Sequence, residues 1–297
     1  TVLVVCDADP QRDDWFACLV DGLRKAFGEV PVHRLPASRD ESPREGETSP
    51  SEAGDASRPA PRAGVERAAP AAPRPSPFSS ERRGRLAVIR VRNPARVGEA
   101  IERAAAEGAD AAVALETRCD TVQRARWREL ARARGLRLLG PATLGFIRPG
   151  IGLNAGRIGP LPNAGNVALV SQSGALAASI MDWSAGTLIG FSLVASLGAE
   201  ADVELPDVLD FLANDNRTKS VVVYLEAVHD ARKFMSAMRA LATVKPVVVL
   251  RGGRRAPAER RVRTHSGAIV GADAIYSAAL RRSGAVAPSC RSRSSTF

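Results

Sequence analysis

Short apolar segments of strand type alternate with amphipathic helical segments along most of the chain, and this alternation constrains the fold more than any other feature. In the first part, expected strands at 2–6, 86–91, 111–115 and 136–139 alternate with expected helices at 15–27, 96–107 and 121–134. Such a pattern predicts a parallel sheet with helices on both faces.

The same alternation returns after Gly165. Expected strands lie at 167–170, 191–197, 220–225 and 247–250. One expected helix ends near 183, and three more are expected at 203–212, 231–241 and 272–282. This order suits a flavodoxin-like doubly wound sheet. The sequence therefore predicts an α/β protein with two doubly wound parallel-sheet domains. The first is Rossmann-like and spans 1–150, the second is flavodoxin-like and spans 160–288, and 289–297 form a tail.

The composition changes abruptly between residues 36 and 77, which hold nine of the chain's 20 prolines and one large aliphatic residue, Val65. A segment of this kind buries too little apolar surface to offset the entropy lost on ordering. We expect a disordered insertion at about 37–80 inside the first domain, with a docking segment as the alternative.

The charge and the remaining composition exclude several functional classes. The net charge of +10 comes from 38 Arg and only 4 Lys, and the 13 aromatic residues are not interleaved with a basic stripe, so nucleic acid is not expected as a partner. No apolar run approaches membrane-spanning length and no secretory signal is present at the start, so we expect a cytoplasmic protein without a membrane partner. Four scattered cysteines and three separated histidines predict reduced thiols and no metal site. A start at Thr1 rather than Met indicates a fragment or a processed product.

Open α/β sheets bind ligands at the carboxyl ends of their strands, and polar residues follow three strands of the second module. Ser171, Gln172, Ser173 and Gly174 come directly after the first of these strands and open a helix. The unpaired N–H groups of a helix start favour a phosphate. A plain serine N-cap is the alternative.

Glu226 ends the third strand of this module, and His265 lies in the Thr264–Gly267 stretch after the fourth. A carboxylate at the end of an apolar strand needs a partner, and a histidine is a suitable one. A histidine between small hydroxyl residues and glycine is well placed as a nucleophile toward phosphate. The alternatives are a strand-end glutamate and a structural histidine.

The first expected strand lacks the glycine-rich turn of a dinucleotide-binding domain. It runs into Cys6, Asp7, Ala8, Asp9 and Pro10, with no glycine. Two aspartates there would also repel a pyrophosphate. A hydride-transferring dehydrogenase is therefore disfavoured.

Several motifs occur in the order found in one known family. They are Gly140-Pro141-Ala142-Thr143-Leu144-Gly145-Phe146, Gly152-Leu153-Asn154-Ala155, Gly165-Asn166 through Ser171-Gln172-Ser173-Gly174, Asp182-Trp183-Ser184, Gly190-Phe191-Ser192, Ser196-Leu197-Gly198, Tyr224-Leu225-Glu226 and His265-Ser266-Gly267-Ala268. From about Leu86 to Val286 the chain resembles the CoA-binding and ligase halves of NDP-forming acyl-CoA synthetases, relatives of the succinyl-CoA synthetase alpha subunit. The strings Asp182-Trp183 and Ala231-Arg232-Lys233-Phe234 are similar to bifunctional acetate–CoA ligase/GNAT proteins, the protein lysine acetyltransferases. The family's Gly-Pro-Asn is Gly140-Pro141-Ala142 here, and its Gly-Asn is Gly198-Ala199.

The resemblance implies an ATP-dependent acid–thiol ligase that forms a CoA thioester through an acyl phosphate and a phosphohistidine. His265 would be the phosphorylated residue and Glu226 the carboxylate that holds it. The phosphate-binding residues would be Ser171, Gln172, Ser173, Gly174, Ser266 and Gly267, and the CoA-binding residues Gly140, Pro141 and Asn154. The first domain would be a degenerate CoA-binding domain.

The same resemblance implies which molecules the chain meets. Its small-molecule partners would be an acid, phosphate and CoA or acyl-CoA, while ATP or ADP with Mg would bind on an ATP-grasp domain or subunit outside these 297 residues. The alternative function is an acyl-CoA-sensing regulatory module of a protein lysine acetyltransferase without ligase activity.

Overall fold

The computed structural model describes residues 2–7, 14–27, 29–36, 84–252 and 273–287. The described parts of residues 1–35 and 83–297 form one compact unit. The insertion expected at 37–80, the loop with His265, Ser266 and Gly267, and the tail at 289–297 lie outside the described residues. Within the described part of the chain, no helix combines the length and apolar character that a membrane span requires.

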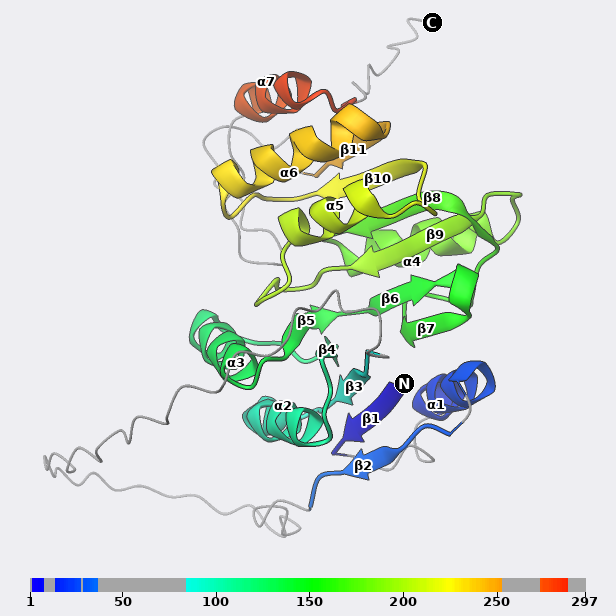
Figure 1. Ribbon diagram of the computed structural model, residues 1–297, viewed down its shortest axis with the longest axis vertical. Helices are drawn as coiled ribbons and strands as arrows, with labels where there is room; N and C mark the ends of the chain where they lie inside the picture. The colour runs from blue at the N-terminus through cyan, green and yellow to red at the C-terminus, as the bar shows by residue number, and fades with distance from the viewer. Residues whose placement is uncertain (1, 8–13, 28, 37–83, 253–272, 288–297) are drawn as a thin grey trace, which may run out of the picture. The chain divides into compact units, whose positions relative to one another are not determined.

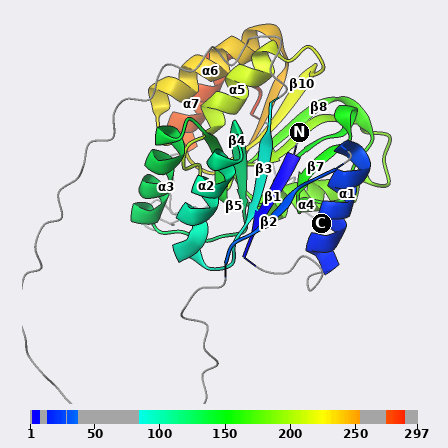
Figure 2. The same cartoon turned by 60° about the horizontal axis from the view of Figure 1, so that its bottom comes forward.

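The first sheet is parallel throughout and has the strand order β2-β1-β3-β4-β5. Its strands are β1 (Val2–Cys6), β2 (Val32–Arg34), β3 (Leu86–Arg90), β4 (Ala111–Leu115) and β5 (Arg137–Thr143). The helices are α1 (Asp14–Phe27), α2 (Val97–Ala106) and α3 (Thr121–Ala133). Figure 2 shows α2 and α3 on one side of the sheet and α1 on the other, in agreement with the two apolar clusters on its faces.

The second sheet has the order β11-β10-β8-β9-β6-β7. Its strands are β6 (Gly145–Arg148), β7 (Leu153–Gly156), β8 (Ala164–Ser171), β9 (Phe191–Ser196), β10 (Ser220–Leu225) and β11 (Val247–Arg251). The helices are α4 (Gly174–Ser184), α5 (Leu205–Asn214), α6 (Ala231–Val244) and α7 (Asp273–Ser283). Helices α5, α6 and α7 share one apolar cluster with the sheet and α4 shares another (Figure 1). Along β8, Ala168 and Val170 belong to the first cluster and Leu169 to the second, as alternation on a strand requires.

The predicted α/β architecture is confirmed, and the structure adds a hairpin to the second sheet. Strand β6 runs antiparallel to both β9 and β7, so the sheet is mixed rather than wholly parallel. The hairpin is short and begins and ends in glycine: Gly145 pairs with Gly156, and a Cβ on Gly145 would lie 2.2 Å from the Ala155 carbonyl oxygen. Four-residue strands of this composition carry no apolar periodicity, which explains why the sequence pattern did not indicate them.

The helix starts that position the site have side-chain caps. Asp120 accepts a hydrogen bond from the Gln123 N–H at 2.7 Å while the Gln123 side chain accepts one from the Asp120 N–H at 3.0 Å, which forms a capping box at the start of α3. Asp230 caps α6 through the Lys233 N–H at 2.9 Å. These caps fix where each helix leaves the sheet edge.

Candidate functional site

Among the described parallel strands of each sheet the strand order reverses once, and ligands of open α/β sheets bind in the crevice beside this point. In the second sheet the chain places β9 on one side of β8 and β10 on the other, so the reversal lies between β8 and β10. Ser171 at the end of β8 pairs in register with Tyr224 of β10, which brings the Ser171–Gly174 turn beside Glu226. The structure therefore brings together most of the expected phosphate-site residues that it describes.

The Gln172 side chain ties the two sides of this crevice together. Its Oε1 accepts hydrogen bonds from the Glu226 N–H at 2.6 Å and the Ala227 N–H at 3.0 Å. Its Nε2 donates to Glu200 Oε1 at 2.6 Å and to the Ala227 carbonyl at 2.9 Å. Both amide hydrogens and both lone-pair positions are thus used within the protein. Gln172 sets the position of the Glu226 backbone.

The serines of the turn organise the start of α4. Ser171 is fully buried, and its hydroxyl donates to the Ser173 carbonyl at 2.7 Å and accepts from the Ser173 N–H at 3.1 Å. The Ser173 hydroxyl accepts the Leu176 N–H at 3.3 Å as an N-cap. A Cβ on Gly174 would lie 2.9 Å from Leu144 Cγ, so glycine permits close packing of the helix start on the loop after β5. The N-cap interpretation of Ser173 is thus confirmed, and the helix start keeps its dipole directed at the crevice.

Glu226 lies half-buried at the end of β10. Burial and the nearby Glu226 carboxylate both raise the pKa of Tyr224. A Cβ on Gly252, directly after β11, would lie 2.5 Å from Tyr224 Oη and 3.8 Å from Glu226 Cγ. The segment that leads to His265 therefore leaves the sheet beside Glu226, although His265 itself lies outside the described residues.

Glu200 belongs to the same network and was not expected from the sequence. The residue is 6% exposed, and its carboxylate accepts hydrogen bonds from Gln172 Nε2 and, at 2.9 Å, from the Leu205 N–H. Burial raises the pKa of Glu200, although these hydrogen bonds oppose the shift. A single glutamate in a polar loop gives no sequence signal that would distinguish it from a surface residue.

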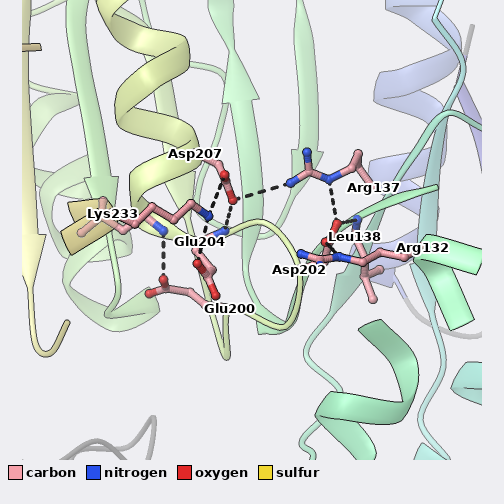
Figure 3. Close-up of polar contacts among 9 residues, drawn as sticks. Arg132, Arg137, Leu138, Glu200, Asp202, Glu204, Asp207 and Lys233 are labelled. Atoms are coloured by element: carbon pink, nitrogen blue, oxygen red, sulfur yellow. Dashed lines mark hydrogen bonds and ion pairs between the residues drawn. The ribbon is translucent and has the colours of Figure 1, made fainter. Parts of the chain in front are cut away.

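Asp202 joins the loop after β9 to the first sheet (Figure 3). Its side chain is fully buried and accepts hydrogen bonds from Arg132 Nε at 2.7 Å, Arg137 Nε at 2.8 Å and the Leu138 N–H at 3.1 Å. Burial alone would raise the pKa of Asp202, but the hydrogen bonds from Arg137, Arg132 and Leu138 outweigh it and lower the pKa. In the same view Lys233 lies between Glu204, at 3.1 Å, and Asp207, at 3.0 Å.

Gly140 and Pro141 lie in β5 and pack against this loop rather than against the Ser171–Gly174 turn. The Ala199 N–H donates to the Pro141 carbonyl at 2.7 Å and the Ala201 N–H to the Gly140 carbonyl at 2.9 Å. Gly198 has a φ of 65°, and a Cβ there would lie 2.3 Å from the Pro141 carbonyl oxygen. Gly140 and Pro141 therefore contact the loop that carries Glu200, and Glu200 in turn accepts a hydrogen bond from Gln172 at the crevice.

Asn154 lies apart from these residues. It is on β7, where its Nδ2 donates to the Gly159 carbonyl at 2.9 Å and its buried Oδ1 has no hydrogen-bond partner among the described residues. It lines a cavity of about 310 Å³ with Cys18 and Leu19 of α1 and with Arg157. The structure does not place Asn154 beside Gly140 and Pro141.

The crevice of the first sheet, between β1 and β3, is occupied by a carboxylate of the chain itself. Asp7 follows β1, and its Oδ2 accepts the N–H groups of Arg92 at 2.8 Å and Asn93 at 3.2 Å after β3. These amides are donors of the kind that bind a diphosphate in a glycine-rich domain. The described residues at this point do not fit a diphosphate, in agreement with the missing glycine turn. No group of three His, Cys, Asp or Glu suited to a metal occurs in the described parts of the chain.

Comparison with known proteins places this site in a family context. Residues 164–289 match the family described as succinyl-CoA ligase like flavodoxin domain. The alpha subunit of acetate–CoA ligase [ADP-forming] I from Pyrococcus furiosus is 39% identical over 159 residues, which are 52% of this chain and 34% of that protein. The 4-hydroxybutyrate–CoA ligase [ADP-forming] from Nitrosopumilus maritimus is 36% identical over 162 residues, 53% of this chain and 23% of that protein.

A solved structure matches over nearly the whole chain. The dinucleotide forming acetyl-coenzyme A synthetase 1 from Ca. Korarchaeum cryptofilum, in complex with phosphate and ADP, has 25% identity and a TM-score of 0.72, and the match covers 97% of this chain and 57% of that chain. The matches span about a third or less of the two curated relatives named above. The resemblance to GNAT proteins stays a prediction. The crevice between β8 and β10 lies within residues 164–289, the part of the chain that matches the succinyl-CoA ligase like flavodoxin domain.

Proposed function

We propose that this chain is the alpha-type module of an NDP-forming acyl-CoA ligase, an acid–thiol ligase that acts through an acyl phosphate and a phosphohistidine. One observation carries the proposal. The crevice between β8 and β10 combines the start of α4 with Glu226, inside the 164–289 match that also contains His265. A helix start stabilises a phosphate, and a carboxylate stabilises a protonated or phosphorylated imidazole.

In the direction that produces a nucleoside triphosphate, the proposed reaction has three group-transfer steps. Phosphate attacks the acyl carbon of an acyl-CoA, which releases CoA as thiol and leaves an acyl phosphate. A nitrogen of His265 takes the phosphoryl group and the carboxylic acid leaves. The phosphoryl group then passes from His265 to ADP. In this scheme Ser173, Gly174, Ser266 and Gly267 bind phosphate, the buried Ser171 hydroxyl holds Ser173 in place, and Gln172 holds the Glu226 backbone.

The partners belong to the same proposal. We infer that an ATP-grasp domain or subunit binds ATP or ADP with Mg and meets the crevice between β8 and β10. The alpha-subunit relative and the ADP and phosphate complex support this assignment. We also propose a division into a CoA-binding domain at 1–150 and a ligase domain at 160–288, with the correction that β6 and β7, at 145–156, belong to the second sheet. We propose a cytoplasmic location.

The proposal also assigns contacts for CoA. Gly140 and Pro141 lie beside the loop that carries Glu200, and we propose them, with Asn154, as contacts for CoA. The Asp7 carboxylate occupies the crevice of the first sheet, so the CoA diphosphate would bind elsewhere. The alternative, an acyl-CoA sensor without ligase activity, has no specific observation in its favour.

The decisive experiment labels the histidine. The purified full chain is incubated with acetyl-CoA and labelled inorganic phosphate, with and without an ATP-grasp subunit of a related ligase. The expected result is an acid-labile, base-stable label on the wild type and none on a folded His265→Ala variant.

His33→Ala is the matched control because His33 lies on β2, in the first sheet, and contacts Arg103. It is expected to keep the label. A folded His265→Ala chain that still carries the label would disprove the assignment of His265. An unlabelled, folded wild type, even with the added subunit, would disprove the ligase proposal.

A further inference from the structure

A second cavity lies between α3 and the loop after β9. Its volume is about 260 Å³, and its lining includes Thr121, Arg124 and Arg128 of α3, together with Glu200, Glu204 and His229. Glu200 and Glu204 were described above for their contacts with Gln172 and Lys233, whereas Thr121, Arg124, Arg128 and His229 have no part in the proposed function.

The two carboxylates of this cavity already have hydrogen-bond or ion-pair partners within the protein. Both oxygens of Glu200 accept hydrogen bonds, from Gln172 Nε2 at 2.6 Å and the Leu205 N–H at 2.9 Å. Glu204 Oε2 pairs with Lys233 Nζ at 3.1 Å (Figure 3). Both carboxylates are therefore held by donors from outside α3, and neither forms an ion pair with Arg124 or Arg128 among the described residues.

The two arginines form no ion pair with the residues that the structure describes. Arg124 and Arg128 are four residues apart and share one face of α3. Arg124 Nη1 donates to the neutral Ala199 carbonyl at 3.2 Å. Arg128 is half-buried and makes no hydrogen bond or ion pair with the residues that the structure describes. Half-buried guanidinium groups without a counter-ion favour an anion.

We propose that this cavity binds a small anionic ligand, through a carboxylate or a phosphate group held between Arg124 and Arg128. The guanidinium groups supply paired N–H donors, and the Thr121 hydroxyl is a further donor at the rim. The volume suits a small acid or inorganic phosphate rather than a nucleotide. The site goes beyond the proposed function, because none of the phosphohistidine chemistry requires it.

Isothermal titration calorimetry on the full chain tests the site, with inorganic phosphate in one arm and succinate in the other at constant ionic strength. We expect saturable binding of at least one anion and at least a tenfold loss of affinity in Arg128→Gln. The matched control is Arg126→Gln, which removes the same charge from an exposed position on the same helix. Arg124→Gln should weaken binding as well, and urea unfolding of each variant confirms that it folds.

Each outcome decides one question. Binding of phosphate alone or succinate alone, with loss in Arg128→Gln, supports the site and identifies the group. Absence of saturable binding in the wild type overturns the proposal, and so do equal affinities for Arg128→Gln and Arg126→Gln. The same titration on His265→Ala is expected to match the wild type, so failure of this site and failure of the phosphohistidine are separate results.

Discussion

Asp202 is a fully buried carboxylate that two arginines and one backbone amide hold as an anion. Replacing it with asparagine removes the charge and presents an amide N–H₂ to guanidinium donors. We expect Asp202→Asn to destabilise the chain by about 2–4 kcal/mol, because a buried charged partner is lost. Urea unfolding at neutral pH measures the change.

The control for Asp202 is Asp210→Asn. Asp210 lies exposed on α5, and its side chain makes no hydrogen bond or ion pair with the described residues. The free energy of unfolding is expected to stay within about 0.5 kcal/mol of the wild type. Equal values for the two variants would show that the Asp202 contacts do not stabilise the fold.

Glu200 gives a dependence of stability on pH whose sign follows from its raised pKa. The unfolded chain releases this proton near pH 4.3, whereas folded Glu200 retains it to higher pH. From about pH 4.3 upward, the wild type should lose stability relative to Glu200→Gln, by at most about 1.4 kcal/mol per pH unit. The loss ends once the pH has passed the folded pKa.

Urea titrations of both proteins at several pH values between 4 and 8 provide the measurement. Taking the difference between the two free energies of unfolding removes the pH dependence contributed by the other titrating groups. A difference that does not change with pH would mean that Glu200 titrates as in the unfolded chain.

The residues at the crevice differ in how well the sequence predicts them. Ser171, Ser173 and Glu226 follow strands directly, so the rule that parallel strands end at one edge was enough to bring them together. Gln172 was expected as a phosphate ligand, but its amide is satisfied by Glu200, Ala227 and Glu226. Glu200 and Asp202 gave no signal, since their partners lie on elements distant in sequence.

At the scale of elements, the loop after β9 depends on glycine where it meets Gly140 and Pro141 of β5. Gly198 has a positive φ, and a Cβ would overlap the Pro141 carbonyl oxygen and the Thr143 nitrogen, both of them backbone atoms. We expect Gly198→Ala to cost at least about 2 kcal/mol of unfolding free energy.

Gly186→Ala is the matched control, because a Cβ there meets nothing within 4 Å and φ is not positive. Its expected effect is neutral or slightly stabilising, since alanine reduces the entropy of the unfolded chain. Denaturant unfolding of the pair tests the argument, which fails if Gly198→Ala is as stable as Gly186→Ala.

The elements that the sequence predicted are those with a clear apolar period. The expected strands at 2–6, 111–115 and 220–225 agree with the observed bounds of β1, β4 and β10. The strands that were not expected are short or begin and end in glycine: β2 has three residues, and β6 pairs with β7 through glycines at its end. Pairing with neighbouring strands, rather than local sequence preference, stabilises such segments, so the local sequence does not predict them.

At the scale of the whole molecule, the two sheets share apolar packing and polar contacts. Leu19 and Leu23 of α1 lie in one apolar cluster with strands of the first sheet and with Leu153 and Ala155 of β7. The Val203 N–H donates to the Leu138 carbonyl at 3.0 Å, beside the Asp202 contacts. Only Leu144 separates β5 from β6. We therefore expect both sheets to unfold as one cooperative unit, although we propose separate functional domains for them.

Native-state hydrogen exchange at increasing urea measures this coupling. The most protected amides of β4 and β9 should converge on one free energy of opening in the wild type, because neither sheet keeps its core when the other unfolds. In Asp202→Asn both free energies should fall together by the amount measured in bulk unfolding. Two separate values in the wild type, with β9 more stable than β4, would mean that the second sheet folds without the first and that the shared cluster contributes little.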